Sequence, residues 1–415
     1  MSQAPAMRPP MLSKAEALDF LLAAARPVQG VESVPTLNAN GRVLAQSQAS
    51  TIDVPSADNT QMDGYAVRAA DCASGCATLS VTQRIAAGQV GTFLAPGQAA
   101  RIFTGALIPE GADAVVMQEQ CDATPPNVVT VRHTPKPGEW VRRAGEDIVA
   151  GGVILAAGTR LRSQELGLAA SVGLASLPVL RRLRVAVFFT GDELAMPGEP
   201  LAPGAIYNSN RFTLRALLEN LGCEISDFGI VPDKLDSTRA TLRDAAAQND
   251  LIITSGGVSV GEEDHVKPAV QAEGRLSMWQ IAIKPGKPLA FGEVNRAGEG
   301  SAYFIGLPGN PVSSFVTFLL LVRPFILRLQ GVRGDVDPRS YPMRAAFDWP
   351  KPDRRNEFLR ARINDAGGLA LFPNQGSGVL TSTVWADGVI DNPPGQRIAP
   401  GDIVRFIPFN ELLNP

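Results

Sequence analysis

The sequence predicts a multidomain protein of the α/β plus β class. Over 183–331, runs that are apolar throughout alternate with amphipathic helical stretches, which is typical of a mainly parallel sheet in a three-layer α/β domain. From about 30 to 180, short β runs are punctuated by Gly and Pro, and the last 80 residues or so have the pattern of a small all-β domain. A chain of 415 residues is long enough for about three or four such domains.

The expected elements follow in chain order. Ser13 and Glu16 resemble a capping box, so the first helix is expected near 13–26. Before the α/β section, strands are expected at 101–103, 114–117 and 128–132, and a helix near 163–175. Within it, the expected strands are 185–189, 225–230, 251–254 and 303–305, and the expected helices lie near 210–221, 236–248, 262–273 and 311–330. After 334 the pattern predicts no helix.

Composition excludes several classes of protein. The net charge of −3 gives no basic field for nucleic acid, and the four cysteines lack zinc-site spacing, which suits reduced thiols in the cytoplasm. The proline-rich N-terminus has no apolar core typical of a secretory signal. The apolar segment 315–329 is interrupted by Arg323, Pro324 and Arg328, so we expect a core helix and no membrane span.

The loop after the expected strand at 251–254 has the residues of an anion-binding turn. It contains Ser255, Gly256, Gly257 and Ser259. Paired glycines let the backbone approach a ligand closely and direct its N–H groups at an anion. A plain glycine-rich turn is the alternative interpretation.

The loop after the strand at 303–305 opens the last long helix. Asn310 is suited to cap that helix, which gives the motif a structural explanation. The same geometry leaves the first helical N–H groups, together with Ser313, available to an oxyanion. Both interpretations stand on the sequence alone.

Two lysines, Lys284 and Lys287, flank a rigid Pro-Gly turn. Lysines on a loop are usually just solvated. Here the neighbouring prolines fix the backbone, so the two ammonium groups are expected to be preorganised for phosphate or another oxyanion.

The carboxylates near these loops have no His or Cys partners in the sequence. They are Asp63, Asp147, Asp192, Glu193, Asp233 and Asp264. Oxygen donors alone suit a hard cation such as Mg²⁺. A turn or helix-cap role explains any single aspartate, but several at strand ends beside anion-binding loops favour a metal–phosphate site.

Taken in order along the chain, these motifs resemble the molybdopterin molybdenumtransferases, the family of the bacterial MoeA proteins and of the gephyrin E domain. The resemblance covers essentially the whole chain. Its motifs lie at 58–66, 101–106, 109–116, 145–148, 190–194, 206–210, 255–261, 284–288 and 306–313.

The resemblance implies an elongated, four-domain subunit in a homodimer. Its expected parts are an extended domain (1–50 with 140–182), an inserted, lid-like, β-rich domain (51–139), a molybdopterin-binding α/β domain (183–331) and a C-terminal small β-barrel (332–415). The active cleft would lie between subunits, with Asp63 and Thr104 from one chain and the α/β loops from the other.

The implied reaction is the Mg²⁺-dependent joining of molybdate to the dithiolene of adenylylated molybdopterin, with release of AMP. The expected catalytic residues are Asp63, Thr104, Asp147, Glu193, Asp233, Asp264, Lys284 and Lys287. The expected contacts to pterin, nucleotide or molybdate are Ser255, Gly256, Gly257, Ser259, Asn310, Ser313, Arg360 and Ser377. The expected metal ligands are Asp192, Glu193 and Asp264.

One position departs from the family pattern. Relatives often carry a lysine four residues before Lys284, where this chain has Gln280, so a third cationic contact to the anion is in doubt. His265, where relatives often have an aromatic residue, is expected to serve packing.

Two alternatives compete with this reading: the neighbouring adenylylation of molybdopterin, and a non-enzymatic gephyrin-like scaffold. Expected protein partners are a second copy of the chain, the molybdopterin adenylyltransferase and other cofactor-synthesis proteins.

Overall fold

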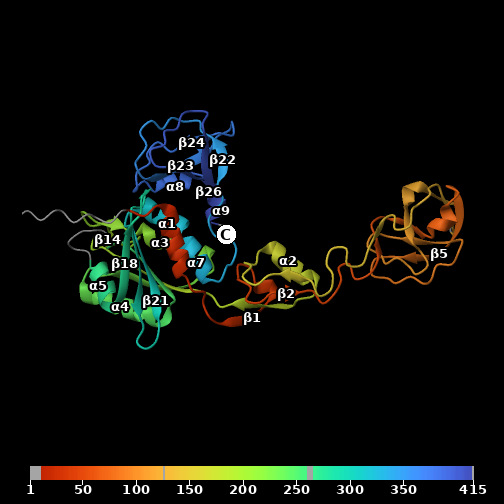
Figure 1. Ribbon diagram of the computed structural model, residues 1–415, viewed down its shortest axis with the longest axis horizontal. Coiled ribbons are helices and arrows are strands. Elements are labelled where there is room, and N and C mark those ends of the chain that lie inside the picture. The colour runs from red at the N-terminus through yellow and green to blue at the C-terminus, as the bar shows by residue number, and fades with distance from the viewer. Residues whose placement is uncertain (1–10, 125–126, 259–264, 414–415) are drawn as a thin grey trace, which may run out of the picture.

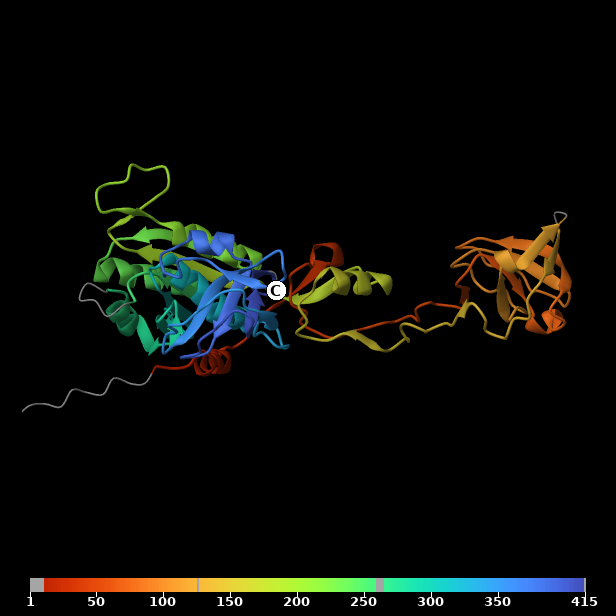
Figure 2. The same cartoon turned by 90° about the horizontal axis from the view of Figure 1, so that it is seen from above.

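The chain forms an elongated molecule with a body at each end and a slim middle segment (Figures 1 and 2). The computed structural model describes residues 11–124, 127–258 and 265–413. The larger body contains an α/β sheet and, beside it, a C-terminal sheet, while the smaller one is a β-rich body around β5 (Ala77–Ile85). Two thin stretches of chain join the smaller body to the middle segment.

The α/β sheet has six strands in the order β16-β13-β17-β21-β20-β18. Their bounds are β13 (Arg184–Thr190), β16 (Glu224–Val231), β17 (Leu251–Ser255), β18 (Gly274–Gln280), β20 (Pro288–Asn295) and β21 (Ser301–Leu307). Strands β16, β13, β17 and β21 pair in parallel, and they correspond to the four strands predicted from the sequence. The last two pair antiparallel, so the sheet is mixed where a mainly parallel one was expected. Strand β18 lies at the sheet edge, and an edge strand needs no continuous apolar run.

Helices cover both faces of this sheet. One face carries α4 (Leu235–Gln248) and α5 (Val266–Glu273), and the other carries α1 (Lys14–Ala24), α3 (Ser209–Asn220), α6 (Pro311–Thr317) and α7 (Arg323–Leu329). Along β13, Val185 and Val187 pack into one core, and Ala186 and Phe188 into the other. This alternation explains why residues 185–189 of the strand are apolar throughout, and it confirms the predicted three layers.

The last helix of this part runs from Pro311 to Leu329. Among the described residues it is the one helix long and apolar enough to cross a membrane, but 94% of its most apolar window is buried inside the fold. A π-helical segment, η4 (Phe318–Val322), interrupts it just before Pro324. Because proline has no N–H to donate to the preceding turn, a widened turn at this point is physically reasonable.

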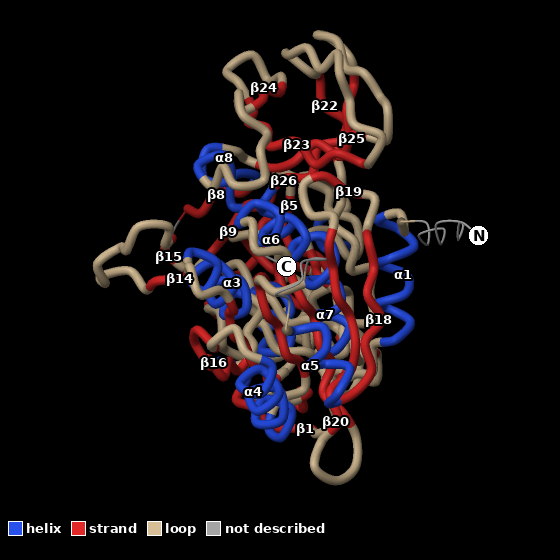
Figure 3. The backbone as a smooth tube through the Cα atoms, turned by 90° about the vertical axis from the view of Figure 1, so that its left-hand side faces the viewer, coloured by secondary structure: helices blue, strands red, loops and turns tan. Residues whose placement is uncertain are grey.

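A second sheet lies above the α/β layers in Figure 3, in the order β19-β23-β25-β26-β22, with β24 against β23. The bounds are β19 (Ile283–Lys284), β22 (Tyr341–Arg344), β23 (Asn356–Ile363), β24 (Leu369–Leu371), β25 (Gly388–Asn392) and β26 (Ile403–Pro408). Its described pairings form an open series, so closure into a small barrel remains a prediction. The expectation of no helix here was wrong, because α8 (Thr381–Trp385) and α9 (Phe409–Leu413) occur. Both are too short to show helical periodicity in sequence.

The middle segment is built from two antiparallel pairs and one helix. Strand β1 (Val31–Pro35) pairs with β12 (Ser176–Leu180), and β2 (Gln48–Ala49) with β11 (Val153–Leu155). The expected helix is α2 (Ser163–Ser171). The first helix, α1, lies apart from this segment and packs against α7, so the assignment of 1–50 to one domain remains a prediction.

The β-rich body at the far end has a six-stranded sheet with apolar clusters on both faces. Its order is β7-β4-β6-β5-β9-β8, from β4 (Gly64–Val67), β5 (Ala77–Ile85), β6 (Gln98–Ile102), β7 (Ala114–Met117), β8 (Cys121–Thr124) and β9 (Val128–Val131). At its base, β3 (Asn59–Thr60) pairs with β10 (Val141–Arg142). A lid-like role for this body remains a prediction.

Asp250 ties the middle segment to the α/β sheet. Arg181, just after β12, donates to both carboxylate oxygens of Asp250 at 2.7 and 2.8 Å, and the Arg184 amide donates at 3.0 Å. Burial alone would raise the pKa of Asp250, but these hydrogen bonds outweigh it and hold the pKa below its usual value. The carboxylate is therefore ionised and stabilising at neutral pH.

We expect Asp250→Asn to lower the free energy of unfolding by about 1–3 kcal/mol at pH 7, because charge-assisted hydrogen bonds are lost. The difference from wild type is full above the ordinary aspartate pKa of about 3.9 and shrinks as the pH falls through the lower folded-state pKa. Urea unfolding across this range measures it. Asp365→Asn, at an exposed turn, is the matched control, and an equal loss in both variants would contradict the assignment.

Candidate functional site

The carboxyl ends of the parallel strands meet at one edge of the α/β sheet. Thr190 of β13 is level with Val231 of β16, and Ser255 of β17 is level with Leu307 of β21. The loops that follow these residues therefore lie side by side, as expected for a ligand edge in a parallel sheet. The sequence placed its acidic and glycine-rich loops at these strand ends, and the structure brings them together.

Glycine is required in the loop after β17. Gly256 and Gly257 have φ of +99° and +64°. A Cβ at Gly256 would lie 2.6 Å from the backbone oxygen of Thr190, and one at Gly257 would lie 2.6 Å from Val266 Cγ2. The backbone thus packs directly against β13, where a side chain would not fit.

Ser255 and the start of the last helix are held together by Asn210 on α3. The Asn210 amide donates to Ser255 Oγ at 2.8 Å and to the Gly309 backbone oxygen at 2.7 Å, and Ser255 Oγ donates to the Pro308 oxygen at 2.9 Å. The N-cap of α3 is Asn208, so the Asn210 side chain is not needed to cap the helix. Asn210 instead fixes the relative position of two ligand loops.

Three of the predicted carboxylates follow strands at this edge. Asp192 and Glu193 are exposed after β13, and Asp233 is half-buried after β16. A Cβ on Gly191 would lie 2.6 Å from Glu193 Oε2, so this carboxylate folds over the turn. The segment after Glu193 forms β14 (Leu194–Ala195) and pairs with β15 (Ile206–Tyr207).

Two predicted residues, Ser259 and Asp264, lie outside the described residues. Over the described ranges, no group of three or more His, Cys, Asp or Glu side chains has the geometry to hold a metal ion. The proposed metal set of Asp192, Glu193 and Asp264 therefore remains a prediction. His265 occupies the N-cap position of α5.

Lys284 lies between a buried carboxylate, Glu357, and a partly exposed one, Asp353, a contact that the sequence did not reveal. Its Nζ lies 3.2 Å from Glu357 Oε1 and 3.5 Å from Asp353 Oδ2. Glu357 is fully buried, and its second oxygen accepts from Trp349 Nε1 at 2.8 Å. Hydrogen bonds from Arg355 hold the pKa of Asp353 well below its usual range. Lys284 thus has compensating charge already, so much of its positive charge is neutralised within the protein.

The second lysine of the turn differs from the first. Lys287 is exposed, and its backbone oxygen accepts from the Ile281 amide at 2.9 Å, while its ammonium has no hydrogen bond or ion pair among the described residues. The turn between the two lysines is fixed by Gly286, where a Cβ would lie 2.3 Å from Thr317 Oγ1 of α6. Gln280, the departure from the family pattern, ends β18, and its backbone oxygen accepts from the Leu12 amide. Lys287 is therefore the lysine of this turn that is open to an anion.

Arg360 is a buried cation whose hydrogen bonds go to neutral groups. It is 1% exposed, and its guanidinium donates to Ser382 Oγ and to the backbone oxygens of Phe358 and Gly376 at 3.1–3.2 Å. Burial lowers the pKa of Arg360 to about 10, so the side chain is charged at neutral pH. An uncompensated buried charge of this kind attracts an anion.

The C-terminal sheet touches the start of α6 next to this arginine. The Val312 amide donates to the backbone oxygen of Ser377 at 3.0 Å. Asn310 is the exposed N-cap residue of α6, as predicted, although its side chain makes no capping hydrogen bond, and Ser313 is buried. The structure thus gathers Asn310, Ser313 and Ser377 in one place.

Asp63 and Thr104 form a separate pair on the β-rich body. Asp63 Oδ1 accepts from the Thr104 amide at 2.8 Å and from Thr104 Oγ1 at 2.7 Å. The hydrogen bond from the Thr104 amide, and then the one from the Thr104 hydroxyl, lower the pKa of Asp63, so the carboxylate stays ionised. In a single chain this pair stands at the opposite end of the molecule from the α/β edge (Figure 2). Asp147 is exposed on the connector between the two ends.

The chain is similar to known proteins along most of its length. Consecutive parts of the chain match the MoeA N-terminal region (domain I and II) over residues 12–173, a probable molybdopterin binding domain over 186–328 and the MoeA C-terminal region (domain IV) over 342–409. The molybdopterin molybdenumtransferase of Haemophilus influenzae is 42% identical over 90% of this chain and 93% of its own length. That of a Nostoc species is 39% identical over 89% and 86%.

A solved structure shares the whole architecture. The crystal structure of the molybdopterin biosynthesis MoeA protein from Pyrococcus horikoshii has a TM-score of 0.82 and 28% identity, covering 96% of this chain and 100% of that one.

We expect Lys284→Met to destabilise the protein by about 1–3 kcal/mol, because it leaves the buried Glu357 without its cation; partial exposure of Lys284 keeps this below the roughly 3–5 kcal/mol typical of a fully buried pair. The double variant Lys284→Met/Glu357→Gln should be more stable than Lys284→Met alone. Denaturant unfolding measures both, with Lys287→Met as the exposed control. A double variant that is less stable than the single one would contradict the pairing.

Proposed function

Because the chain belongs to the MoeA family of molybdopterin molybdenumtransferases, and is thus a transferase of molybdenum-cofactor biosynthesis, we propose that it joins molybdate to the dithiolene of adenylylated molybdopterin. In this reaction the diphosphate bond of the substrate is cleaved by water. AMP leaves with one phosphate, and the other phosphate stays on the pterin. Molybdate exchanges oxygen ligands for the two dithiolene sulfurs.

The observation that carries this proposal is the convergence of anion-binding groups at the α/β edge. The backbone at Gly256 and Gly257, the ammonium of Lys287 and Ser313 at the start of α6 lie at or near strand ends that are level with one another. Molybdate and a diphosphate repel each other, so a site that joins them must supply fixed positive charge and dipoles. Arg360 adds buried positive charge beside Ser377 and α6.

The residues divide into two binding regions. The glycine loop is proposed to hold the diphosphate and pterin, with Ser255 positioned by Asn210. Lys287 and Arg360 are proposed to hold molybdate, while Lys284 orients the turn through Glu357. This assignment makes Lys284 a positioning residue more than an anion ligand.

The donors at this edge fit Mg²⁺. Asp192 and Glu193 are exposed oxygen donors next to the proposed diphosphate region, and Mg²⁺ typically uses one or two carboxylates together with substrate phosphates. When bound, Mg²⁺ would neutralise charge on the phosphate oxygens. Asp233 lies at the same edge and is proposed to position this group or the nucleotide.

Asp63 and Thr104 are proposed to act on a neighbouring subunit. Their distance from the α/β edge in one chain leaves them no access to their own site, so a homodimer would place them over the partner's. Asp147 on the connector would approach from the same side. We propose a cytoplasmic homodimer that receives its adenylylated substrate from the preceding adenylyltransferase.

The test of this function is AMP release by the purified full chain with adenylylated molybdopterin, Mg²⁺ and molybdate, omitting each component in turn. Molybdate-dependent AMP release, with molybdenum appearing on the pterin, is expected. Formation of adenylylated molybdopterin from ATP and molybdopterin would support the neighbouring reaction instead. Pterin binding without either activity would favour a scaffold.

We expect Asp63→Asn to fold normally, since the side chains are nearly isosteric, and to lower kcat/KM by about 10²–10³-fold through loss of a charge that acts on the reacting groups. The matched control is Asp122→Asn on β8 of the same body. Steady-state AMP release and thermal unfolding measure the two effects. Wild-type turnover by a folded Asp63→Asn protein would remove this residue from the site.

A further inference from the structure

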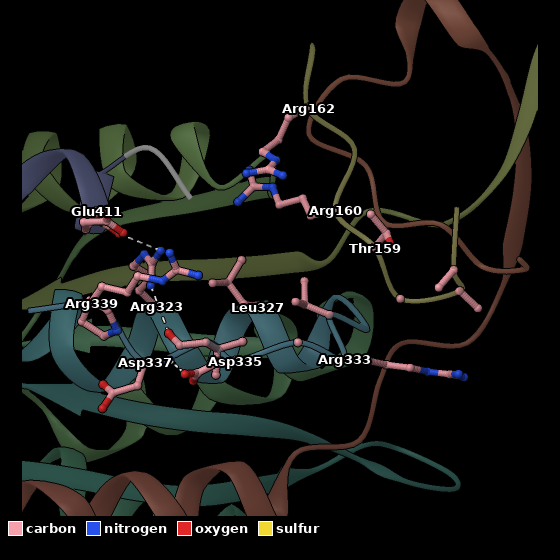
Figure 4. A pocket seen from close by; sticks show the side chains of 17 residues that line it. Thr159, Arg160, Arg162, Arg323, Leu327, Arg333, Asp335, Asp337, Arg339 and Glu411 are labelled. Carbon is pink, nitrogen blue, oxygen red and sulfur yellow. Dashed lines mark hydrogen bonds between the residues drawn. The ribbon is translucent and has the colours of Figure 1, made fainter. Parts of the chain in front are cut away.

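A second basic centre lies away from the strand edge, where the middle segment meets the larger body. A cavity of about 750 Å³ opens between the segment 156–162 and the linker 332–339 (Figure 4). The arginines that line it are Arg160, Arg162, Arg323, Arg333 and Arg339. None of the residues assigned to the transferase site lines this cavity.

Three acidic residues, Asp335, Asp337 and Glu411, line the cavity together with the five arginines, so the acidic residues do not balance this charge. Asp337 is occupied by Lys14, whose Nζ lies 2.7 Å from its Oδ2. The Glu411 carboxylate accepts from the Tyr341 hydroxyl at 2.7 Å. In the described part of the chain, Arg160, Arg323 and Arg339 have no carboxylate oxygen within 4.0 Å.

Two of these arginines are also short of hydrogen-bond partners. Arg323 is 6% exposed; its Nη atoms donate to the backbone oxygens of Val336 and Glu411, but its Nε has no partner in the described structure. Arg160 donates weakly to the Asn220 oxygen at 3.4 Å, and its Nε and Nη1 are buried without described partners. Burial, together with the nearby charge of Arg160, lowers the pKa of Arg323 to about 10.

A structural role accounts for only part of this arrangement. The hydrogen bonds to the two backbone carbonyl groups explain the position of the Nη atoms of Arg323. It does not explain why a second guanidinium, that of Arg160, lines the same cavity with two of its nitrogens buried and without partners in the described structure. Buried like charges are costly unless a counter-charge offsets them.

We propose that this cavity binds a phosphate-type oxyanion, either free or as the phosphate group of a small molecule, with Arg160, Arg323 and Arg339 as its counter-charges. Guanidinium groups match the geometry of phosphate oxygens and donate in pairs. The anion neutralises the repulsion between Arg160 and Arg323.

The position of the cavity gives binding a mechanical consequence. Arg160 belongs to the middle segment, whereas Arg323 and Arg339 belong to α7 and the linker of the larger body. Across this junction the Arg333 amide donates to the Gly158 oxygen at 3.3 Å. A bound anion adds attraction between the two parts and so restrains the segment that leads to Asp63.

The experiment is calorimetric titration of the full chain with inorganic phosphate and, separately, with AMP, at constant ionic strength. We expect saturable binding of at least one of them. Arg339→Gln and Arg160→Gln should each weaken it by about tenfold or more, since a charge-assisted contact is lost. Arg397→Gln, exposed and not lining the cavity, makes the same charge change and should bind like wild type.

A variant at the strand edge separates this site from the transferase site. Lys287→Gln should retain the binding measured here, whatever its effect on turnover. Where Arg339→Gln weakens the binding and Lys287→Gln retains it, binding of phosphate identifies a free anion as the ligand of the cavity, and binding of AMP alone identifies a phosphate ester. Thermal unfolding checks the fold, and exposed Arg339 keeps the test valid if Arg160→Gln is unstable. Absence of binding by wild type, equal affinity in Arg339→Gln and Arg397→Gln, or loss confined to Lys287→Gln would overturn the proposal.

Discussion

Parallel pairing of β16, β13, β17 and β21 is the constraint on which the rest of the site depends. In a parallel set every strand ends at the same edge, so loops separated by more than a hundred residues of sequence become neighbours. The backbone of the loop after β17 packs against β13 only because Gly256 and Gly257 have no side chains. Asn210 then ties this loop to the start of α6. A preorganised anion site needs such rigid placement, because flexible groups would lose entropy on binding.

Much of this architecture could be predicted from local patterns, and the rest depends on contacts that no local pattern records. Strands buried on both faces are mostly apolar, so β13, β17 and β21 were identified correctly. Strand β16 lies at the other edge of the sheet and is only half-buried, but its apolar residues near both ends were enough to identify it. Edge strand β18 lacks that pattern, and the pairing of β19 with β23 joins segments from different parts of the chain. The contact of buried Glu357 with Lys284 could not be predicted, because the two residues are far apart in the sequence. Of the expected site residues, those at the α/β edge were brought together, while Asp63 and Thr104 pair with each other elsewhere.

The elongated shape gives the two ends of the molecule different tasks. The larger body has the fixed charges and glycine turns suited to holding oxyanions, and the smaller one presents an ionised Asp63 held by Thr104. A slim segment connects them, clamped to the sheet by Arg181 and Asp250 and bordered by the arginine cavity. In the proposed homodimer, this segment would set where Asp63 meets the neighbouring subunit. A change in the position of this segment would then alter both the contact between subunits and the position of Asp63 at the site.

Complementation between subunits tests the central claim most directly. Asp63→Asn and Lys287→Gln chains, each inactive alone, are unfolded together, refolded as a mixture and assayed for AMP release. If a site combines Asp63 of one chain with the strand edge of the other, each mixed dimer has one intact site, and a random mixture should recover about a quarter of wild-type activity. Activity no higher than that of the separate variants, in a mixture shown to contain mixed dimers, would contradict the account.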